Sequence, residues 1–279
     1  MQELRQHHPL DGLLEVAGLA RSTFYYQQKA LQVADKYAQL KELILKVFTY
    51  HKGNYGYRRV ADEIREDHGQ VVNYKTMRRL MGEMGLKSEQ RPKKYNSFKG
   101  EVGATAPNHL DRQFGADQPN EKLVTDITEF KVRGEKLYLS PVLDLYNGEI
   151  IAFEMNRRPV FEMVSCMIKK VFARLRPQDK PMLHSDQGWH YRMKQYRKQL
   201  ENRGMVQSMS RKGNCHDNAV MENFFGILKS EMFHRTKFSS IDQLQLAITS
   251  YIEYYNCKRI KSKLKGLSPV KYRVRHAIS

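Results

Sequence analysis

Three acidic residues stand in surroundings that suit metal-assisted chemistry. Asp126 interrupts an apolar segment, and Asp186 ends another. A charge within an apolar strand is costly unless it is paired or bound to a ligand, and α/β folds place ligands at the carboxyl ends of strands. Glu222 follows on a segment with helical spacing, for which Asp217 is the expected N-cap. Three convergent carboxylates can hold two Mg²⁺ ions, which clamp the attacking and leaving oxygens of a phosphoryl transfer.

The expected helix that carries Glu222 has one polar face. Helical spacing places Asn218, Glu222, Gly226 and Lys229 along that face. Lys229 lies almost directly above Glu222 after two turns, and glycine leaves room for the close approach of a backbone or a ligand. A carboxylate beside a lysine suits a metal-bound phosphate, because the carboxylate holds the cation and the lysine pairs with the phosphodiester.

Several neighbouring residues allow two interpretations. Asp144 has the same local surroundings as the acidic residues above, with a structural role as the alternative. His184 and His216 flank the candidate site, and packing or capping is favoured over metal ligation. Trp189 and Tyr191 follow Asp186 and either stack on an exposed base or pack inside the protein.

The net charge narrows the class of partner. The chain has 279 residues, with 48 Lys and Arg against 30 Asp and Glu, which gives +18. A hydrophobic content of 41% supports a buried core, and the excess positive charge predicts a polyanionic partner such as nucleic acid. The longest apolar runs are far below the ~18 residues of a membrane span, so no membrane partner is expected. Three cysteines and no apolar leader predict a cytoplasmic location.

Residues 121–279 are expected to form one α/β domain with a basic C-terminal tail. Three strands are predicted over 124–132, 136–145 and 149–156, and the Asn147-Gly148 pair is typical of a hairpin. Helices and short strands then follow in the order 159–176, 181–186, 191–203, 206–209, 218–235 and 241–256. This order predicts a mixed sheet flanked by helices.

Small all-helical units are expected before this domain. Residues 1–34 have a helix-turn-helix outline, with a structural hairpin as the alternative. Residues 35–88 form a second unit whose last helix follows an Asn73 N-cap. That helix has a basic stripe typical of a DNA recognition helix, with a solvated face as the alternative: Lys75, Arg78 and Arg79. Residues 89–120 are expected to be a linker.

Basic residues elsewhere are expected to neutralise DNA phosphates. Arg211 and Lys212 precede the segment that leads to Glu222. The segment 258–275 has eight Lys and Arg and no acidic residue. Phosphate contacts of this kind do not depend on base sequence. An ordinary solvated surface is the alternative.

The spacing of the acidic residues resembles a known superfamily. Asp126 and Asp186 are separated by 59 residues, and Asp186 and Glu222 by 35, as in the DDE transposases and retroviral integrases, which have an RNase H-like core. Local motifs resemble the OrfB proteins of the insertion-sequence family three transposases, near the one-fifty subgroup. These motifs are Tyr55-Gly56-Tyr57-Arg58-Arg59, Thr125-Asp126-Ile127-Thr128-Glu129-Phe130, Leu137-Tyr138-Leu139-Ser140-Pro141, His184-Ser185-Asp186-Gln187-Gly188, Glu222-Asn223-Phe224-Phe225 and Leu267-Ser268-Pro269.

The resemblance implies an activity and partners. Asp126, Asp186 and Glu222 would bind two Mg²⁺ ions, with Mn²⁺ able to substitute, and Lys229 would contact DNA near the reactive phosphate. Water would release a 3′-OH at the end of the element, and that hydroxyl would attack a second phosphodiester. The DNA partners would be the terminal inverted repeats and the target. The family also implies an OrfA product or an OrfA–OrfB fusion, and a homo-oligomer on paired ends.

Three other functions are alternatives to a transposase. A retroelement integrase should carry a His-His-Cys-Cys zinc module near its N-terminus, but no cysteine precedes Cys166. A hydrolase of the RNase H type would share the fold but not Lys229 or the helical units. A non-catalytic DNA-binding half that requires an upstream partner is the main alternative, and three intact carboxylates argue against a decayed copy.

Overall fold

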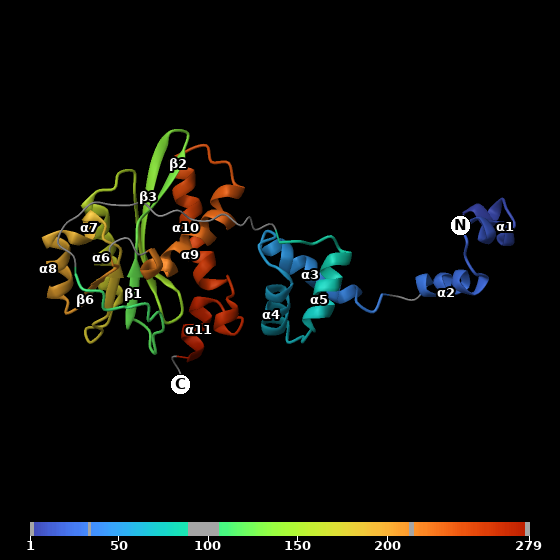
Figure 1. Ribbon diagram of the computed structural model, residues 1–279, viewed down its shortest axis with the longest axis horizontal. Coiled ribbons are helices and arrows are strands. Elements are labelled where there is room, and N and C mark those ends of the chain that lie inside the picture. The colour runs from blue at the N-terminus through green and yellow to red at the C-terminus, as the bar shows by residue number, and fades with distance from the viewer. Residues whose placement is uncertain (1–2, 33–34, 89–105, 212–214, 277–279) are drawn as a thin grey trace.

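The α/β domain is built on one six-stranded sheet (Figure 1). The computed structural model describes residues 3–32, 35–88, 106–211 and 215–276. The strands are β1 (Lys122–Thr125), β2 (Thr128–Val132), β3 (Glu135–Asp144), β4 (Ile150–Asn156), β5 (Met182–Ser185) and β6 (Val206–Met209). β3 pairs antiparallel with β1, β2 and β4, whereas β1, β5 and β6 run parallel. The sheet is therefore mixed, as predicted.

A single expected strand over 124–132 is divided in two. β1 and β2 pair with β3 in one continuous register, with Thr125 opposite Val142 and Thr128 opposite Leu139. Between them, the backbone N–H of Ile127 donates to the Asp126 carboxylate at 2.7 Å. Because the Asp126 carboxylate accepts this backbone hydrogen bond, the strand is interrupted at Asp126.

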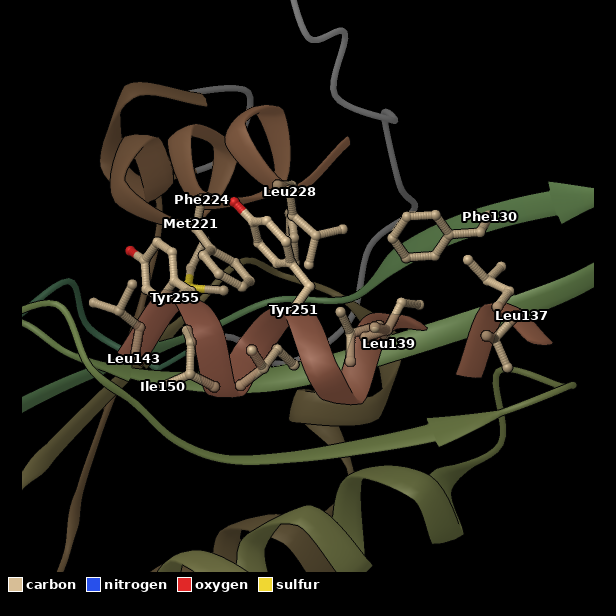
Figure 2. Close-up of a cluster of buried hydrophobic side chains, with 14 of the residues drawn as sticks. Phe130, Leu137, Leu139, Leu143, Ile150, Met221, Phe224, Leu228, Tyr251 and Tyr255 are labelled. Atoms are coloured by element: carbon tan, nitrogen blue, oxygen red, sulfur yellow. The ribbon is translucent and has the colours of Figure 1, made fainter. Parts of the chain in front are cut away.

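Helices cover both faces of the sheet. α6 (Phe161–Arg174), α7 (Trp189–Arg192) and α8 (Lys194–Asn202) pack on one face, and α9 (Ala219–Glu231) and α10 (Ile241–Cys257) pack on the other. Successive strand residues serve opposite cores: Leu123 packs with α6, whereas Val124 packs with α9 and α10. In Figure 2, aromatic rings of α9 and α10 lie over the aliphatic side chains of β3 and β4.

Two expected helix boundaries were wrong. The segment 191–203 contains two helices, because the backbone of Met193 is extended (ψ 138°) between α7 and α8. The expected helix over 218–235 ends at Glu231, and a short 3₁₀ turn, η3 (Phe233–Arg235), follows. The basic C-terminal segment also folds, as η4 (Ser262–Leu264) and α11 (Pro269–His276).

The N-terminal third is helical. Its elements are η1 (Leu4–Gln6), α1 (Leu10–Val16), α2 (Arg21–Gln32), α3 (Ala38–Tyr50), α4 (Tyr57–His68) and α5 (Tyr74–Glu83). Another 3₁₀ turn, η2 (Cys215–Asn218), directly precedes α9. We call α3 to α5 the helical unit. The predicted Asn73 N-cap is confirmed, because its side chain accepts from the Lys75 N–H at 2.8 Å. Gly69 ends α4 with a φ of 65°, which glycine adopts without strain.

The helical unit packs against the end of the α/β domain. Ile260 belongs to the apolar core of the helical unit, and its N–H donates to the Tyr55 hydroxyl at 2.9 Å. The His51 ring stacks on Tyr55, and its Nδ1 lies 2.8 Å from the Tyr254 hydroxyl on α10. Buried polar and apolar contacts therefore join the two parts.

Part of the expected linker also packs on the sheet domain. Leu110 is buried in the core beneath α9, and its N–H and that of His109 donate to the Ser208 hydroxyl. Met209 N–H donates to the carbonyl of Pro107 at 3.2 Å. Residues 89–105 lie outside the described residues. None of the helices described is long and apolar enough to cross a membrane.

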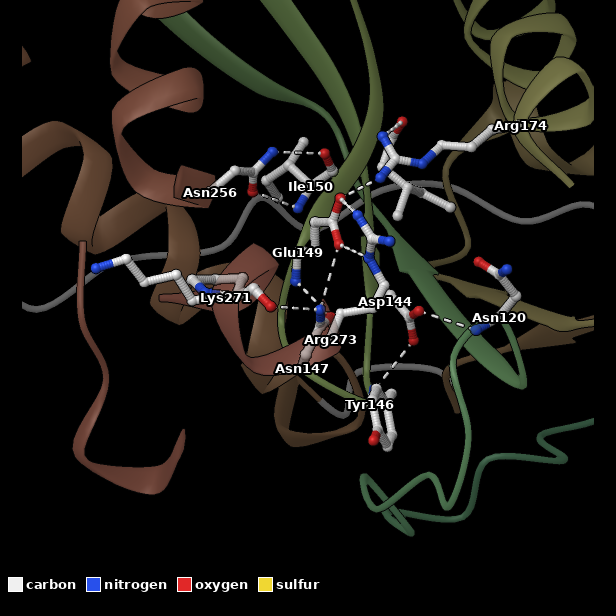
Figure 3. A network of polar contacts seen from close by, with 12 residues as sticks. Asn120, Asp144, Tyr146, Asn147, Glu149, Ile150, Arg174, Asn256, Lys271 and Arg273 are labelled. Carbon is white, nitrogen blue, oxygen red and sulfur yellow. Dashed lines mark hydrogen bonds and ion pairs between the residues drawn. The ribbon is translucent and has the colours of Figure 1, made fainter. Parts of the chain in front are cut away.

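A buried carboxylate ties the β3–β4 hairpin to two helices (Figure 3). Glu149 accepts hydrogen bonds from Arg174 of α6 and from Arg273 of α11, the latter at 2.8 Å from Nε. Asn147 Nδ2 donates to Glu149 at 3.2 Å and to the Pro269 carbonyl at 2.9 Å. The hairpin turn is thus the point to which α11 is anchored.

Replacing Glu149 with Gln is expected to destabilise the domain. The Glu149 side chain is 2% exposed and its arginine partners are 34–40% exposed. Losing the charge of a buried pair whose partners reach solvent should cost about 2 kcal/mol. Urea denaturation should show a lower midpoint. Glu154→Gln, which breaks the pair of a half-buried carboxylate with the exposed Lys170, is the control and should cost less than about 1 kcal/mol. Equal shifts for both variants would contradict the anchoring role.

Candidate active site

The pairing of β1 with β5 places two aspartates side by side. The strands are parallel, and Val124 lies opposite His184. Asp126 and Asp186 are each two residues further along and so leave the sheet at the same edge. Both side chains are partly accessible, which leaves the edge open to a ligand. The structure thus brings together two of the predicted residues.

Local backbone donors orient these carboxylates. The Asp186 Oδ1 atom accepts from the Gly188 N–H at 2.9 Å, as Asp126 does from Ile127. A Cβ at Gly188 would lie 2.9 Å from the same Asp186 oxygen, so only glycine allows this close approach.

Glu222 reaches the same edge from α9. The helix is fixed by the buried residues Met221, Phe224, Phe225 and Leu228, which leave Glu222 partly accessible. Burial raises the pKa of Asp126 well above its ordinary value, and the negative charges of Asp186 and Glu222 raise it further. The charge of Lys229 acts in the opposite direction. Asp186, Glu222 and Lys229 therefore all act electrostatically on Asp126.

The donor set suits a hard divalent cation. All three groups are carboxylates, and their mutual repulsion is what a bound cation would relieve. Across the residues that the structure describes, no three Asp, Glu, His or Cys side chains already meet around one point. Asp126 and Asp186 are the adjacent pair, with Glu222 on the facing helix. Such a geometry suits Mg²⁺, which keeps several waters and takes one or two carboxylates.

His184 lies behind the site, as a packed residue. It is fully buried, its Nδ1 is 2.8 Å from the Ser208 hydroxyl, and its Nε2 is 3.1 Å from the Ser210 hydroxyl. Burial lowers the pKa of His184 to about 4, so the ring is neutral at pH 7. Both nitrogens have protein partners, which supports the packing interpretation over metal ligation.

The prediction that Asp217 caps α9 was wrong. The N-cap is Asn218, which makes no capping hydrogen bond through its side chain. Asp217 instead accepts from Arg112 Nε at 3.0 Å and from Arg211, whose hydrogen bond is the main reason that the pKa of Asp217 is lowered. Asp217 therefore holds the segment before Glu222 against residues far away in sequence, which local spacing does not reveal.

Asp144 lies at the other end of β1. It is opposite Leu123 in the sheet and accepts from the backbone N–H groups of Asn120 (2.9 Å) and Tyr146 (3.0 Å), as Figure 3 shows. Burial raises its pKa to about 6. These contacts support the structural alternative for Asp144.

The residues predicted to contact DNA occupy several environments. Lys75 and Arg78 are exposed on α5, whereas Arg79 pairs with Glu83 and lies over the Tyr37 ring at 5.2 Å. Arg211 pairs with Asp217 and Asp111, Lys229 lies 5.2 Å from the Phe130 ring, Asn218 is buried, and Lys212 is outside the described residues.

One polar side chain near the carboxylates, Arg192, was not expected from the sequence, whereas Asn218 was. Within the described part of the chain, the buried Nε and Nη1 atoms of Arg192 and both amide atoms of Asn218 have no hydrogen-bond partner. The charge of Arg192 lowers the pKa of Asp186, against the larger effect of burial. Arg192 carried no motif that would have singled it out.

Models of three protein families match this chain. An integrase core domain matches residues 116–215, and a second integrase core domain matches residues 222–276. An HTH-like domain matches residues 36–94, which include the helical unit. The sheet and the helical unit each fall within a matched region, as does α9 from Glu222 onward.

Curated relatives decide the family. The putative transposase InsK for insertion sequence element IS150 of Escherichia coli (strain K12) is 54% identical over 273 residues, covering 98% of this chain and 96% of that protein. The transposase InsF for insertion sequence IS3A of the same organism is 30% identical over 271 residues, covering 94% and 93%. This chain belongs to the insertion-sequence family three transposases. The transposase is also similar to the HTLV-2 integrase catalytic core domain in complex with magnesium, at 16% identity, with a TM-score of 0.45 and coverage of 56% of this chain and 98% of that chain.

The family predicted from the motifs is thus confirmed. The transposase has the expected integrase-type α/β domain and an HTH-like domain before it. The match to this chain covers almost the whole length of the two transposases, so a purely accessory DNA-binding protein is not favoured.

Replacing Asp126 with Asn should stabilise the transposase in EDTA. The change relieves repulsion from Asp186 and Glu222, and about 1 kcal/mol should raise the melting temperature by roughly 2–4 °C. Mg²⁺ should raise the melting temperature of the wild type but not of the variant. Asp117→Asn, an exposed carboxylate, is the control and should behave as wild type. A lower melting temperature for Asp126→Asn in EDTA would count against repulsion at this site.

Proposed function

We propose that the transposase cleaves and joins DNA at the ends of its insertion sequence, with Asp126, Asp186 and Glu222 as ligands of two divalent ions. The observation that supports the proposal is the β1–β5 pairing, which puts Asp126 beside Asp186, together with the electrostatic effect of Glu222 on Asp126. Mg²⁺ is the proposed cofactor, with Mn²⁺ able to substitute. When bound, the ions supply electrostatic stabilisation of the attacking and leaving oxygens.

Residues of the protein then supply position and charge. Asp126 and Asp186 are oriented by the N–H groups of Ile127 and Gly188, so little reorganisation is needed at the edge of the sheet. Lys229 is half-buried on the same helix as Glu222, and we propose that it pairs with a phosphate near the scissile bond. The chemistry is hydrolysis of one P–O bond by water, which frees a 3′-OH. That hydroxyl then attacks a second phosphodiester, where a new P–O bond forms as the bond to the leaving 3′ oxygen breaks.

DNA contact is proposed for the other basic residues. Lys75 and Arg78 are exposed on α5 and suit DNA binding by the helical unit. Arg79, Arg211, Lys212 and Asn218 stay predictions, and the ion pairs of Arg79 and Arg211 would have to be exchanged for phosphate contacts.

The organisation and partners of the enzyme are also proposals. We propose units over 1–34 and 35–88, a connecting segment 89–120, and a catalytic domain over 121–279. The partners are the terminal inverted repeats, target DNA, an OrfA product or fusion, and further copies of this chain on paired ends. The proposed location is the cytoplasm, at the nucleoid when DNA is bound.

Replacing Glu222 with Gln should abolish cleavage. The loss of one ion ligand should cost several kcal/mol of transition-state stabilisation, which is at least a ~100-fold lower rate. A gel assay with labelled DNA ending in the element's own terminal repeat, in Mg²⁺ and in EDTA, measures this effect. DNA binding should persist. Glu253→Gln, an exposed residue of α10, is the matched control and should cleave as wild type.

The same assay tests the dependence on an upstream partner. Mg²⁺-dependent nicking at the 3′ end with joined products would establish that this chain acts alone. Binding without cleavage would identify it as the downstream half of a fusion, and the fusion would then be assayed. An inactive fusion would overturn the catalytic role.

A further inference from the structure

A cleft lies where the helical unit meets the turn after η4. Its volume is about 440 Å³. One wall is formed by Arg58, Asp62 and Arg65 of α4 and by Tyr74 at the start of α5, and the other by Lys265 and Gly266. The cleft is far in sequence from the three carboxylates of the candidate active site.

The charge in the cleft is mainly positive. Three cations, Arg58, Arg65 and Lys265, face one carboxylate. That carboxylate, of Asp62, accepts from the Tyr74 hydroxyl at 2.7 Å and lies 3.3 Å from the Arg65 guanidinium. Among the described residues, neither Arg58 nor Lys265 has an ion-pair partner within 4.0 Å. Two positive charges therefore stay available for an anion.

The two walls are held together by close packing. Lys265 and Gly266 have φ angles of 56° and 82°, which turn the chain toward α4. A Cβ at Gly266 would lie 3.2 Å from Asp62 Cβ and 3.3 Å from an Arg65 nitrogen, so glycine allows this approach. Below the cleft, Ile260 packs in the core of the helical unit. The cleft is therefore shaped by the packing between the helical unit and the turn after η4.

The cleft continues the DNA-binding face proposed for α5. Tyr74 is the first residue of α5, and the exposed Lys75 and Arg78 follow within its first two turns. Resting on the DNA-processing function proposed above, we propose that the cleft binds a backbone phosphate of the duplex that α5 contacts. The duplex is then held jointly by the helical unit and by the C-terminal turn.

The salt dependence of DNA binding tests this proposal. A double variant, Arg58→Gln with Lys265→Gln, removes the two available charges. The affinity of the full chain for a labelled 30-base-pair duplex is measured from low to physiological salt. The slope of log K against log salt should become shallower by about 1 for each phosphate that the variant no longer neutralises. The control, Lys169→Gln with Lys198→Gln, removes two exposed charges from α6 and α8, away from the helical unit in Figure 1.

The outcomes separate the cleft from general charge effects. An equal change in the control, or no change in the double variant, overturns the proposal. Inorganic phosphate that stabilises the wild type but not the double variant, with an unchanged DNA slope, would assign the cleft to a small anion instead. Failure of DNA cleavage by the wild type bears on the catalytic proposal alone, because this measurement uses binding.

A different observation concerns Tyr191 of α7, beneath Asp186. Its side chain is 1% exposed, and among the described residues its hydroxyl has no hydrogen-bond partner. A Cβ at Gly188 would lie 2.9 Å from Asp186 Oδ1 and 3.4 Å from Tyr191 Cδ2, so only this glycine separates the ring from the carboxylate. The nearby Thr125 hydroxyl donates to the Pro141 carbonyl at 2.8 Å.

A buried hydroxyl without a partner costs about 1–3 kcal/mol. A phenol hydroxyl, with an ordinary pKa of about 10, carries its proton at pH 7 and can donate it to a hydrogen bond. We infer that Tyr191 is a positioning residue, which donates to a carboxylate oxygen of the Asp126–Asp186 pair when a divalent ion binds. This inference rests on the metal site proposed above.

Metal binding by Tyr191→Phe tests this inference. Mn²⁺ titration followed by electron paramagnetic resonance should show about 10-fold weaker binding, as for other groups that orient metal ligands. Tyr196→Phe is the matched control: Tyr196 is fully buried, its hydroxyl also has no partner among the described residues, and its ring centroid is 5.4 Å from that of Tyr191. The control should bind Mn²⁺ as wild type.

The outcomes distinguish positioning from packing. Equal weakening in both variants, or unchanged Mn²⁺ binding in Tyr191→Phe, overturns the inference. A wild type that binds no Mn²⁺ overturns the metal site itself, and with it this role for Tyr191.

Discussion

The parallel pairing of β1 with β5 is the constraint on which the rest of the site depends. A shift of one residue in this register would turn Asp126 or Asp186 to the opposite face of the sheet. The register is fixed by apolar neighbours on both faces, since Leu123 and Val124 point to different cores. Two carboxylates that repel each other are thus held together by hydrophobic packing, which far exceeds the repulsion in free energy.

Helix α9 has two roles: its buried side packs in the core, and its accessible side carries Glu222. Its buried side, through Met221, Phe224 and Leu228, joins the core above β3 and β4 (Figure 2). Its accessible side carries Glu222 toward the aspartates. At its C-terminal end, Glu231 is buried with Arg259, and Arg59 of the helical unit approaches the same carboxylate at 3.7 Å. One helix therefore connects the candidate active site, the core and the helical unit.

Local patterns predicted the elements well, because strands and helices here follow apolar periodicity. β6 was predicted at its observed residues and α10 to within one residue, and α5 begins directly after the predicted Asn73 N-cap. The division of the first strand at Asp126 arises from a hydrogen bond between a side chain and the backbone, which periodicity does not contain. The motifs singled out three acidic residues. In the structure Asp126 and Asp186 follow paired strands, and Glu222 acts electrostatically on Asp126.

Long-range contacts account for what the sequence did not reveal. Asp217 was expected to cap α9, but its partner Arg112, 105 residues away in sequence, reaches it only through the folded chain. Tyr191, Arg192 and the cleft beside Gly266 depend on how separate segments meet. Spacing along the sequence predicts a helix face or a strand edge, whereas burial of a polar group is a property of the packed molecule.

The Glu231–Arg259 pair has a consequence for how this chain can vary. Both side chains are at most 2% exposed, and Tyr251 also donates to Glu231 at 2.8 Å. Burial acts to raise the pKa of Glu231, but Arg259 outweighs it, and the pKa is lowered. Loss of Glu231 alone would leave the buried Arg259 without its carboxylate partner, at a cost of about 3–5 kcal/mol, and loss of Arg259 would leave Glu231 with only the more distant Arg59 as a cation. The two positions, 28 residues apart, are therefore expected to change together rather than one at a time.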